Sequence, residues 1–137
     1  MCIRAGGSIL DSDYHHGNGT QSIFYERADV QFVSRHAGPT QEYPVFLGYS
    51  DEIGQGAGEG FNVNYPMEWG TGFDVWGQAL KDACQEVASF TPDAVVVSLG
   101  VDTFEKDPIS QFKLKSQDFT ETGRIIAGLD LPTVFLL

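Results

Sequence analysis

The run from Ala94 to Leu99 (AVVVSL) is the feature that most strongly limits how this chain folds. It holds three consecutive valines and no charged residue, and Gly100 follows it directly. An uninterrupted apolar run of this length is typical of a central parallel strand that is buried on both faces. Parallel strands must be joined by crossover connections, which are usually helices. The run therefore predicts an α/β fold, with a parallel sheet and crossover helices on both faces.

The rest of the chain alternates short apolar runs with helical patterns, as such a fold requires. We predict further strands over residues 8–13, 30–34, 60–65 and 133–137, and irregular loops over residues 35–59 and 103–115. The clearest helix opens near residues 71–74, and its apolar stripe at helical spacing is formed by Trp76, Leu80, Ala83, Val87 and Phe90. This stripe is predicted to face the core.

Two shorter helices are predicted from weaker patterns. The first covers residues 20–27, with Thr20 as its cap and with Ile23 and Phe24 turned inward. The second is capped by Ser116. Its inner face is formed by Phe119, Ile126 and Leu129.

The composition limits the partners of the chain. Its 137 residues suffice for one domain, and 8 Lys and Arg stand against 19 Asp and Glu, for a formal net charge of -11. This charge repels nucleic acid and anionic membranes, so we expect neither as a direct partner. No apolar stretch approaches the roughly 20 residues of a membrane helix. Cys2 and Cys84 form no paired framework, so we expect reduced thiols and a cytoplasmic protein.

The stretch from Asp11 to Gly19 (DSDYHHGNG) concentrates two carboxylates, two imidazoles and two glycines in nine residues. If the first strand continues into this stretch, Asp11, Asp13 and His15 share one face, because side chains at i, i+2 and i+4 of an extended chain point the same way. Such a spacing of two acids and an imidazole is typical of metal ligands.

Parallel strands deliver their loops to one edge of the sheet, where open α/β proteins place their chemistry. The predicted strands end close to Asp13 and His15, to Ser34 and His36, and to Asp102. Asp13, His15 and Asp102 offer three protein ligands and leave open coordination positions on the metal, which is typical of a catalytic site. Zinc is the first choice of metal, and Fe2+ or Co2+ are the alternatives. Taken singly, each residue is also a common turn former or helix cap, so a structural role stays open.

Three motifs make the sequence recognisable. They are Asp11 to Gln21 (DSDYHHGNGTQ), Gly58 to Pro66 (GEGFNVNYP) and Ser98 to Pro108 (SLGVDTFEKDP). Together they resemble the histone deacetylase superfamily, and specifically its acetylpolyamine aminohydrolase branch. The resemblance runs from about Leu10 to the last residue. It implies a partial fold of the arginase/deacetylase type.

The resemblance also implies roles for individual residues. Asp13, His15 and Asp102 would hold the zinc ion, and Asp11 would orient a catalytic histidine. Asn18 stands where many deacetylases of protein lysines carry an aspartate, so an amide would orient the second catalytic histidine. This difference favours the polyamine branch.

Two structural potassium ions and a substrate tunnel are implied as well. The first ion is expected among the side chains of Asp11 and Ser34 and the main-chain oxygens of Asp13, His15 and Arg35. The second is expected among the main-chain oxygens of Phe24, Arg27, Val30 and Phe61. The tunnel positions are Tyr43 and Ile109.

The implied reaction is metal-assisted amide hydrolysis, in which zinc polarises the acetyl carbonyl and acidifies its water, a histidine takes the proton and a donor stabilises the oxyanion. The family takes its base from a His-His pair upstream of the position of Asp11, and its donor from a Gly-Gly-Tyr segment after the last strand. His15 and His16 are not that pair, because His15 is a zinc ligand and His16 faces the other way, where packing or a hydrogen bond is expected. We therefore expect residues 1–137 to be a single domain, the central portion of a deacetylase-like catalytic domain, with little or no activity by itself.

The expected substrate of full-length relatives is an acetylated polyamine, a small cationic acetylated amine, because Asn18 and the net acidity favour it. An acetylated protein lysine is the alternative substrate. Two interpretations of another class stay open. One is a catalytically inactive protein that binds metal or an acyl ligand. The other is an assembly protein whose open sheet edges are completed by another chain, and we expect a homo-oligomer.

Overall fold

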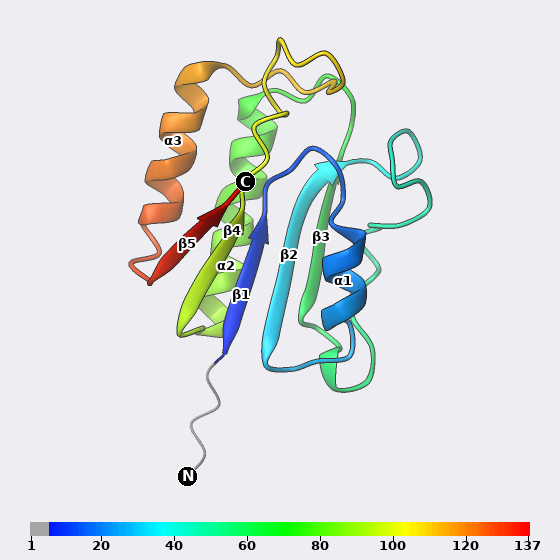
Figure 1. The fold of residues 1–137 in the computed structure, drawn as a ribbon, viewed down its shortest axis with the longest axis vertical. Coiled ribbons are helices and arrows are strands. Elements are labelled where there is room, and N and C mark those ends of the chain that lie inside the picture. The colour runs from blue at the N-terminus through cyan, green and yellow to red at the C-terminus, as the bar shows by residue number, and fades with distance from the viewer. Residues whose placement is uncertain (1–5) are drawn as a thin grey trace.

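The sheet of the computed structural model, which describes residues 6–137, consists of parallel strands in the order β3-β2-β1-β4-β5. The strands are β1 (Gly7–Asp11), β2 (Val30–Ala37), β3 (Asn62–Met67), β4 (Ala94–Ser98) and β5 (Thr133–Leu136). Cys2 lies outside the described residues. The apolar run that begins at Ala94 forms β4, next to the central strand β1 (Figure 1). The predicted parallel α/β sheet is confirmed.

Helices lie on both faces of this sheet, as predicted (Figure 1). Helix α1 (Asn18–Phe24) covers β2 and β3 on one face, whereas α2 (Phe73–Phe90) and α3 (Ser116–Ala127) pack on the other. A short 3-10 helix, η1 (Gly56–Gly58), lies in the long connection between β2 and β3. No helix of the described residues is long and apolar enough to cross a membrane.

The face of the sheet under α2 and α3 holds the hydrophobic core. The strands contribute Leu10, Val33, Val95 and Val97, all fully buried, and α2 contributes Trp76, Leu80, Ala83 and Val87. The predicted stripe of α2 is therefore confirmed, except that Phe90 is only half-buried and packs on Phe61 with ring centroids 5.3 Å apart. Burying these apolar side chains supplies the main favourable free energy of the fold.

The opposite face is polar where α1 covers it. Its buried side chains include Ser34, His36, Asn62 and Asn64. Helix α1 packs Gln21 against this surface, and the side chain of Gln21 is only 7% exposed. The side chain of Ile23 is 67% exposed. The prediction that Ile23 faces inward is wrong, because Gln21 is the buried residue of α1 and meets the side-chain amides of Asn62 and Asn64. Thr20 is also not the cap, since α1 begins at Asn18 after Gly17.

The predicted boundaries need further corrections. β1 ends at Asp11 rather than Asp13, and β2 continues to Ala37. Helix α3 is capped by Lys115, whose main-chain N–H donates to Asp118 Oδ2 at 2.7 Å, so Ser116 is the first helical residue rather than the cap.

β4 is not buried on both faces. Val95 and Val97 are fully buried under the helices, but Val96 is only half-buried and Ala94 is exposed. On that side Val96 lies level with Ile9 of β1 and Val134 of β5, in a part of the sheet that no helix of the described chain covers (Figure 1). The second apolar face of β4 is therefore open in this chain.

Candidate metal centre

Asp13, His15 and Asp102 come together at the carboxyl edge of the sheet, as predicted. One potential ligand atom from each lies within 4.8 Å of the others. His15 Nδ1 is 3.4 Å from Asp13 Oδ1 and 3.3 Å from Asp102 Oδ2. Metal–ligand bonds of about 2.0–2.1 Å at tetrahedral angles place neighbouring ligand atoms about 3.3–3.4 Å apart. The two distances therefore suit a tetrahedral ion such as zinc.

Turns rather than an extended strand bring Asp13 and His15 together. Asp11 Oδ1 accepts the main-chain N–H of Asp13 at 3.1 Å, and Asp13 Oδ1 accepts that of His15 at 2.8 Å. These side-chain-to-backbone hydrogen bonds form two successive Asx turns directly after β1. The sequence pattern places Asp13 and His15 on one side because side chains alternate along an extended chain. That reason does not apply, since the extended strand β1 ends at Asp11.

Asp102 reaches the same place from the loop after β4. Its Oδ1 accepts the main-chain N–H of Tyr14 at 3.0 Å, which leaves Oδ2 facing His15. Gly100 allows this approach, since a Cβ at that position would overlap the main chain of Asp13. Burial raises the pKa of Asp102, against the opposing effect of the Tyr14 hydrogen bond. A cation between the carboxylates would remove the cost of holding them ionised so close together.

Asp11 lies behind this group and is not part of it. It is 4% exposed, and burial raises the pKa of its carboxyl group to about 6, although the hydrogen bond from the Asp13 main chain opposes the shift. The carboxylate thus holds the turn that presents Asp13. The histidine that the resemblance would place against Asp11 is not one of the three histidines of this sequence, which are His15, His16 and His36.

Tyr43 and Ile109 are exposed on two separate loops, and Tyr43 lies beside His15. The ring centroids of Tyr43 and His15 are 6.4 Å apart, and the side chains of Tyr43 and Ile109 are 69% and 66% exposed. A carboxylate anchored by main-chain N–H groups accompanies each: Glu42 accepts from Tyr43, and Asp107 accepts from Ile109 and Ser110. These hydrogen bonds lower the pKa of Asp107, with that to Ser110 the largest cause.

Ser34 and His36 lie side by side on β2 under α1, fully buried. His36 Nε2 is 2.9 Å from the main-chain oxygen of Gly48, which only accepts, so Nε2 carries the proton. Burial lowers the pKa of His36 to about 4, so the ring is neutral near pH 7 and Nδ1 is an acceptor. The Ser34 hydroxyl, 2.8 Å away, must donate to it. The lone pairs of Ser34 Oγ are thereby left for another partner.

Arg35 points to the opposite face, into the core. Its guanidinium lies over the Trp76 ring, 4.3 Å from the centroid, and burial lowers its pKa to about 10. Only the main-chain oxygen of Arg35 is relevant to the potassium prediction.

The residues predicted for the second potassium ion lie in the turn region between α1 and β2 and beside it. Phe24 O accepts from Arg27 N at 2.9 Å, and Phe61 O accepts from Phe32 N at 2.9 Å. Val30 is the first residue of β2. Each carbonyl oxygen has two lone pairs, so the two that accept here keep capacity for a further partner.

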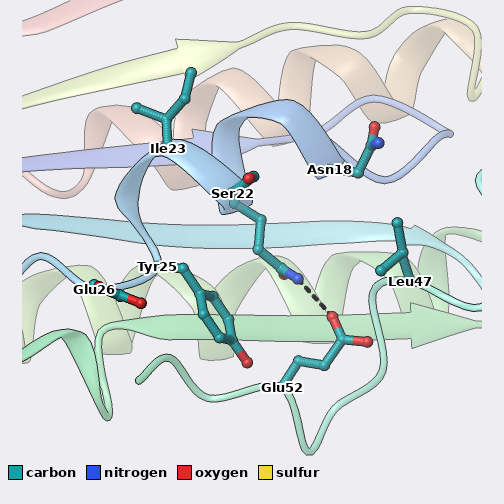
Figure 2. Close-up of a pocket in the computed structure, with 8 residues that line it drawn as sticks. Asn18, Ser22, Ile23, Tyr25, Glu26, Leu47 and Glu52 are labelled. Atoms are coloured by element: carbon teal, nitrogen blue, oxygen red, sulfur yellow. Dashed lines mark hydrogen bonds between the residues drawn. The ribbon is translucent and has the colours of Figure 1, made fainter. Parts of the chain in front are cut away.

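Asn18 is exposed at the start of α1 and borders a pocket of about 650 Å3. Figure 2 shows this pocket with Asn18 at one end and Tyr25, Leu47 and Glu52 around it. Asp13, His15 and Asp102 do not line it. The pocket is therefore separate from the metal-ligand group.

A hydrogen-bonded cluster lies beneath α1 that the sequence patterns did not predict. It consists of His16, Gln21, Glu52, Asn62 and Asn64. The expectation that His16 is packed or hydrogen-bonded is confirmed, since it is 4% exposed and its Nε2 lies 3.0 Å from Gln21 Oε1. A signal for the rest existed in Asn62 and Asn64, which alternate in an apolar strand and so share one face.

Comparison with known proteins agrees with this architecture. Residues 8–137 match the family described as Histone deacetylase domain. The chain belongs to this family. It is 60% identical over 130 residues to acetylpolyamine amidohydrolase 1 of Pseudomonas aeruginosa, covering 95% of this chain and 38% of that protein. It is 40% identical over 136 residues to histone deacetylase 6 of Caenorhabditis elegans, covering 89% of this chain and 14% of that protein.

The crystal structure of acetylpolyamine aminohydrolase from Burkholderia pseudomallei superposes with a TM-score of 0.93 at 45% sequence identity, covering 96% of this chain and 38% of that one. The predicted family and the partial deacetylase-type fold are therefore confirmed. The chain spans about two fifths of the length of this family member and of the Pseudomonas protein.

Proposed function

We propose that this chain forms the metal-holding portion of a zinc-dependent amidohydrolase that removes acetyl groups from acetylated polyamines. The observation that carries the proposal is the convergence of Asp13, His15 and Asp102 with ligand-atom separations of 3.3 and 3.4 Å. Fe2+ and Co2+ suit the same nitrogen and oxygen donors, so they are the alternative ions.

Within this proposal the residues divide the work. Zinc at this site would polarise the acetyl carbonyl and lower the pKa of a bound water. The Asx turn at Asp11 presents Asp13, and the Tyr14 main chain orients Asp102. We propose that the general base and the oxyanion donor are supplied by a His-His pair and a tyrosine outside residues 1–137, in a catalytic domain of which this single domain is the central portion. Asp11 and Asn18 would then each orient one histidine of that pair.

Two observations support an acetylated polyamine as substrate. Sequence identity to the Pseudomonas acetylpolyamine amidohydrolase is 60%, against 40% to the Caenorhabditis histone deacetylase. The net charge of -11 attracts a cationic amine. We propose that Tyr43, whose ring lies beside His15, and Ile109 form walls for the alkyl chain. An acetylated protein lysine presents the same alkyl chain and is the second candidate substrate.

We also propose a structural potassium ion beside the zinc site, held by side-chain oxygens of Asp11 and Ser34 and by the main chain of Asp13, His15 and Arg35. The donor set fits, because the His36 tautomer leaves the lone pairs of Ser34 Oγ available and Asp11 supplies negative charge. A second ion is proposed among the main-chain oxygens of Phe24, Arg27, Val30 and Phe61, which are all hard oxygen donors.

The test begins with the chain alone. Metal-free protein is titrated with Zn2+ by calorimetry, and one ion per chain is expected. Asp13→Ala should weaken binding about 100-fold, since a tetrahedral zinc site draws roughly 10–16 kcal/mol from four ligands. Asp74→Ala, the same change at an exposed aspartate, should bind like the wild type. Failure of the wild type to bind any divalent ion would contradict the metal centre.

A second measurement tests the division of labour. The chain alone is expected to hydrolyse N-acetylputrescine at a negligible rate, because its three histidines do not include the base pair. A rate close to that of a full-length relative, abolished by Asp13→Ala, would contradict the proposed external base. Binding of acetylated amines without turnover under all conditions, including in a full-length protein, would favour an inactive acyl-ligand-binding protein.

Cellular location and assembly complete the proposal. We propose a cytoplasmic protein, since Cys84 is a free, buried thiol and Cys2 offers no predicted partner. We propose self-association through the open face and edge at β5, where Val134 and Leu136 are 56% and 55% exposed. Sedimentation analysis tests this, and a strictly monomeric chain would contradict the homo-oligomer and the assembly interpretation.

A further inference from the structure

Gln21 of α1 is a buried amide at the centre of four segments of the chain. Its Oε1 lies 3.0 Å from His16 Nε2, 2.9 Å from Asn62 Nδ2 and 2.8 Å from Asn64 Nδ2. Its Nε2 donates to Glu52 Oε2 at 2.5 Å, the hydrogen bond that reaches Glu52 in Figure 2. One side chain thus joins the segment after β1, the strand β3 and the loop that precedes η1.

The main chain fixes which atoms of these amides face one another. Asn62 Nδ2 also donates to the main-chain oxygen of Glu52 at 2.6 Å, and Asn64 Nδ2 donates to that of Tyr49 at 3.2 Å. A main-chain carbonyl only accepts, so both asparagines must turn their NH2 groups to this side. The atom of Gln21 that meets both NH2 groups must then be its oxygen. Its own NH2 group is left to face the Glu52 carboxylate.

This orientation also determines the tautomer of His16. Gln21 Oε1 has no proton, so His16 Nε2 must donate to it. Nδ1 has no hydrogen-bond partner among the described residues, so Nε2 is the ring atom through which His16 is held. The main-chain carbonyls of Glu52 and Tyr49 thus fix the orientation of the Gln21 amide. The Gln21 amide in turn fixes which nitrogen of His16, the residue next to His15, donates the hydrogen bond.

Through Glu52, the Gln21 amide is also connected to the loop that contains Gly48 and Tyr43. Glu52 Oε2, which accepts from Gln21, also accepts from the main-chain N–H of Gly48 at 3.0 Å. Gly48 has a φ of +97°, and a Cβ there would collide with the rings of His16 and His36. Only glycine therefore fits at this crossing. The chain leads back from Gly48 to Tyr43, whose ring lies beside His15.

We propose that Gln21 is a positioning residue for the metal centre. It holds His16, and through the main chain His15, against β3, and it ties this segment to the loop that carries Tyr43. The inference rests on the proposed metal centre, since it assigns Gln21 to a site that Asp13, His15 and Asp102 form. Hydrogen bonds made directly to a ligand typically change metal affinity by about 10–100-fold, and Gln21 acts one residue away from His15, so an effect at the lower end of this range is expected.

Gln21→Met tests the proposal, and Gln31→Met is its matched control. Gln31 is 3% exposed on the other face of the sheet, where it accepts from Ser8 Oγ and donates to Glu86 O. Both variants lose a buried, hydrogen-bonded amide, but only Gln21 contacts the ligand segment. Co2+ is titrated into each metal-free protein, and its visible absorption reports both affinity and coordination geometry. Urea unfolding of the metal-free proteins measures the loss of stability separately.

We expect Gln21→Met to weaken Co2+ binding at least about 10-fold and to alter its absorption spectrum, and Gln31→Met to change affinity less than about 2-fold. Equal losses in the two variants would overturn the inference while leaving the metal centre intact. A wild type that binds no Co2+ would overturn the metal centre itself, and the inference with it.

A second measurement does not depend on a variant that folds. Two-bond 1H–15N correlation spectra of the metal-free wild type distinguish the tautomers of its three histidines. We expect His16 to carry its proton on Nε2. A proton on Nδ1 would show that His16 does not donate to Gln21 and would overturn the proposal, whatever the behaviour of Gln21→Met.

Discussion

The metal-ligand group and the cluster beneath α1 lie next to each other but are held in different ways. Asp13, His15 and Asp102 are partly exposed, with side chains 25–40% accessible, and main-chain N–H groups orient both carboxylates. In the cluster, the side chains of His16 and Gln21 are buried and bound to other side chains. Turns thus leave ligand lone pairs free for an ion, while the buried network provides the rigid support.

Burial shifts the pKa of an ionisable group in each of the two regions, and the two shifts are in opposite directions. Behind the proposed metal ligands, Asp11 is a buried acid whose ionised form is destabilised, so its pKa rises to about 6. Under α1, His36 is a buried base whose ionised form is destabilised, so its pKa falls to about 4. The metal-free protein should therefore lose stability from the two regions as the pH moves in opposite directions.

The largest expected effect comes from His36. Its pKa is lower in the folded chain, about 4 against 6.5, so the unfolded chain binds more protons between these values. The stabilising contribution is fully present above pH 6.5 and is lost as the pH falls through about 4. His36→Asn removes this dependence, so the difference in free energy of unfolding between wild type and variant should grow by about 3 kcal/mol from pH 4 to pH 6.5. Urea unfolding at a series of pH values measures it.

Neighbouring groups set the control for this experiment. His16 and Glu52 also act on His36, by repulsion and attraction respectively. The control is Ile23→Ala, a change at an exposed side chain that is not ionisable, so its difference from the wild type should not depend on pH. A pH-independent difference for His36→Asn would mean that the ring is not neutral and buried in solution, and the contrast between the regions would fail.

Asp11 should show the next largest effect, with the opposite sign. Its pKa is raised in the folded chain, from 3.8 to about 6, so its favourable contribution is present below pH 3.8 and is lost as the pH rises through about 6. Asp11→Asn keeps an acceptor for the Asp13 N–H but carries no charge. The variant should therefore gain about 2 kcal/mol relative to the metal-free wild type between pH 4 and pH 7.

Adding an ion sharpens this second test. Zn2+ and K+ favour the ionised form of a nearby carboxylate, so the advantage of Asp11→Asn at pH 7 should shrink when both are present. Urea unfolding with and without the ions measures the change. An advantage that is unaffected by either ion would contradict a cation site beside Asp11.

The convergence of Asp13, His15 and Asp102 could be predicted from the sequence because parallel strands follow a simple rule. Parallel strands end at one edge of the sheet, so Asp13 and Asp102 had to lie near each other whatever the details of the loops. The reason offered for the pairing of Asp13 with His15 was nevertheless incorrect, since the extended chain ends at Asp11. The turns that replace it depend on which donors a carboxylate finds, and a periodic pattern carries no such information.

The cluster beneath α1 was harder to predict because it contradicts the usual rule that apolar side chains face inward. α1 has only seven residues, too few for a stripe to be distinguished from chance, so Ile23 was assigned to the inner face. The decisive information lies in β3, where Asn62 and Asn64 make the surface beneath α1 polar. A helix that covers such a surface must present hydrogen-bonding groups, as Gln21 does.

The smallest expected effect concerns the outer face of α1. Ile23 is 67% exposed, whereas Ile126 of α3 is 2% exposed, so replacing each by alanine compares the same change outside and inside the core. Ile126→Ala should cost about 2–5 kcal/mol in the free energy of unfolding, and Ile23→Ala should stay within about 0.5 kcal/mol. Urea unfolding at two protein concentrations measures both. If Ile23→Ala costs more than about 1 kcal/mol only at the higher concentration, another copy of the chain covers α1. A cost above about 1 kcal/mol at both concentrations would mean that Ile23 packs inward and that Gln21 does not occupy the inner face.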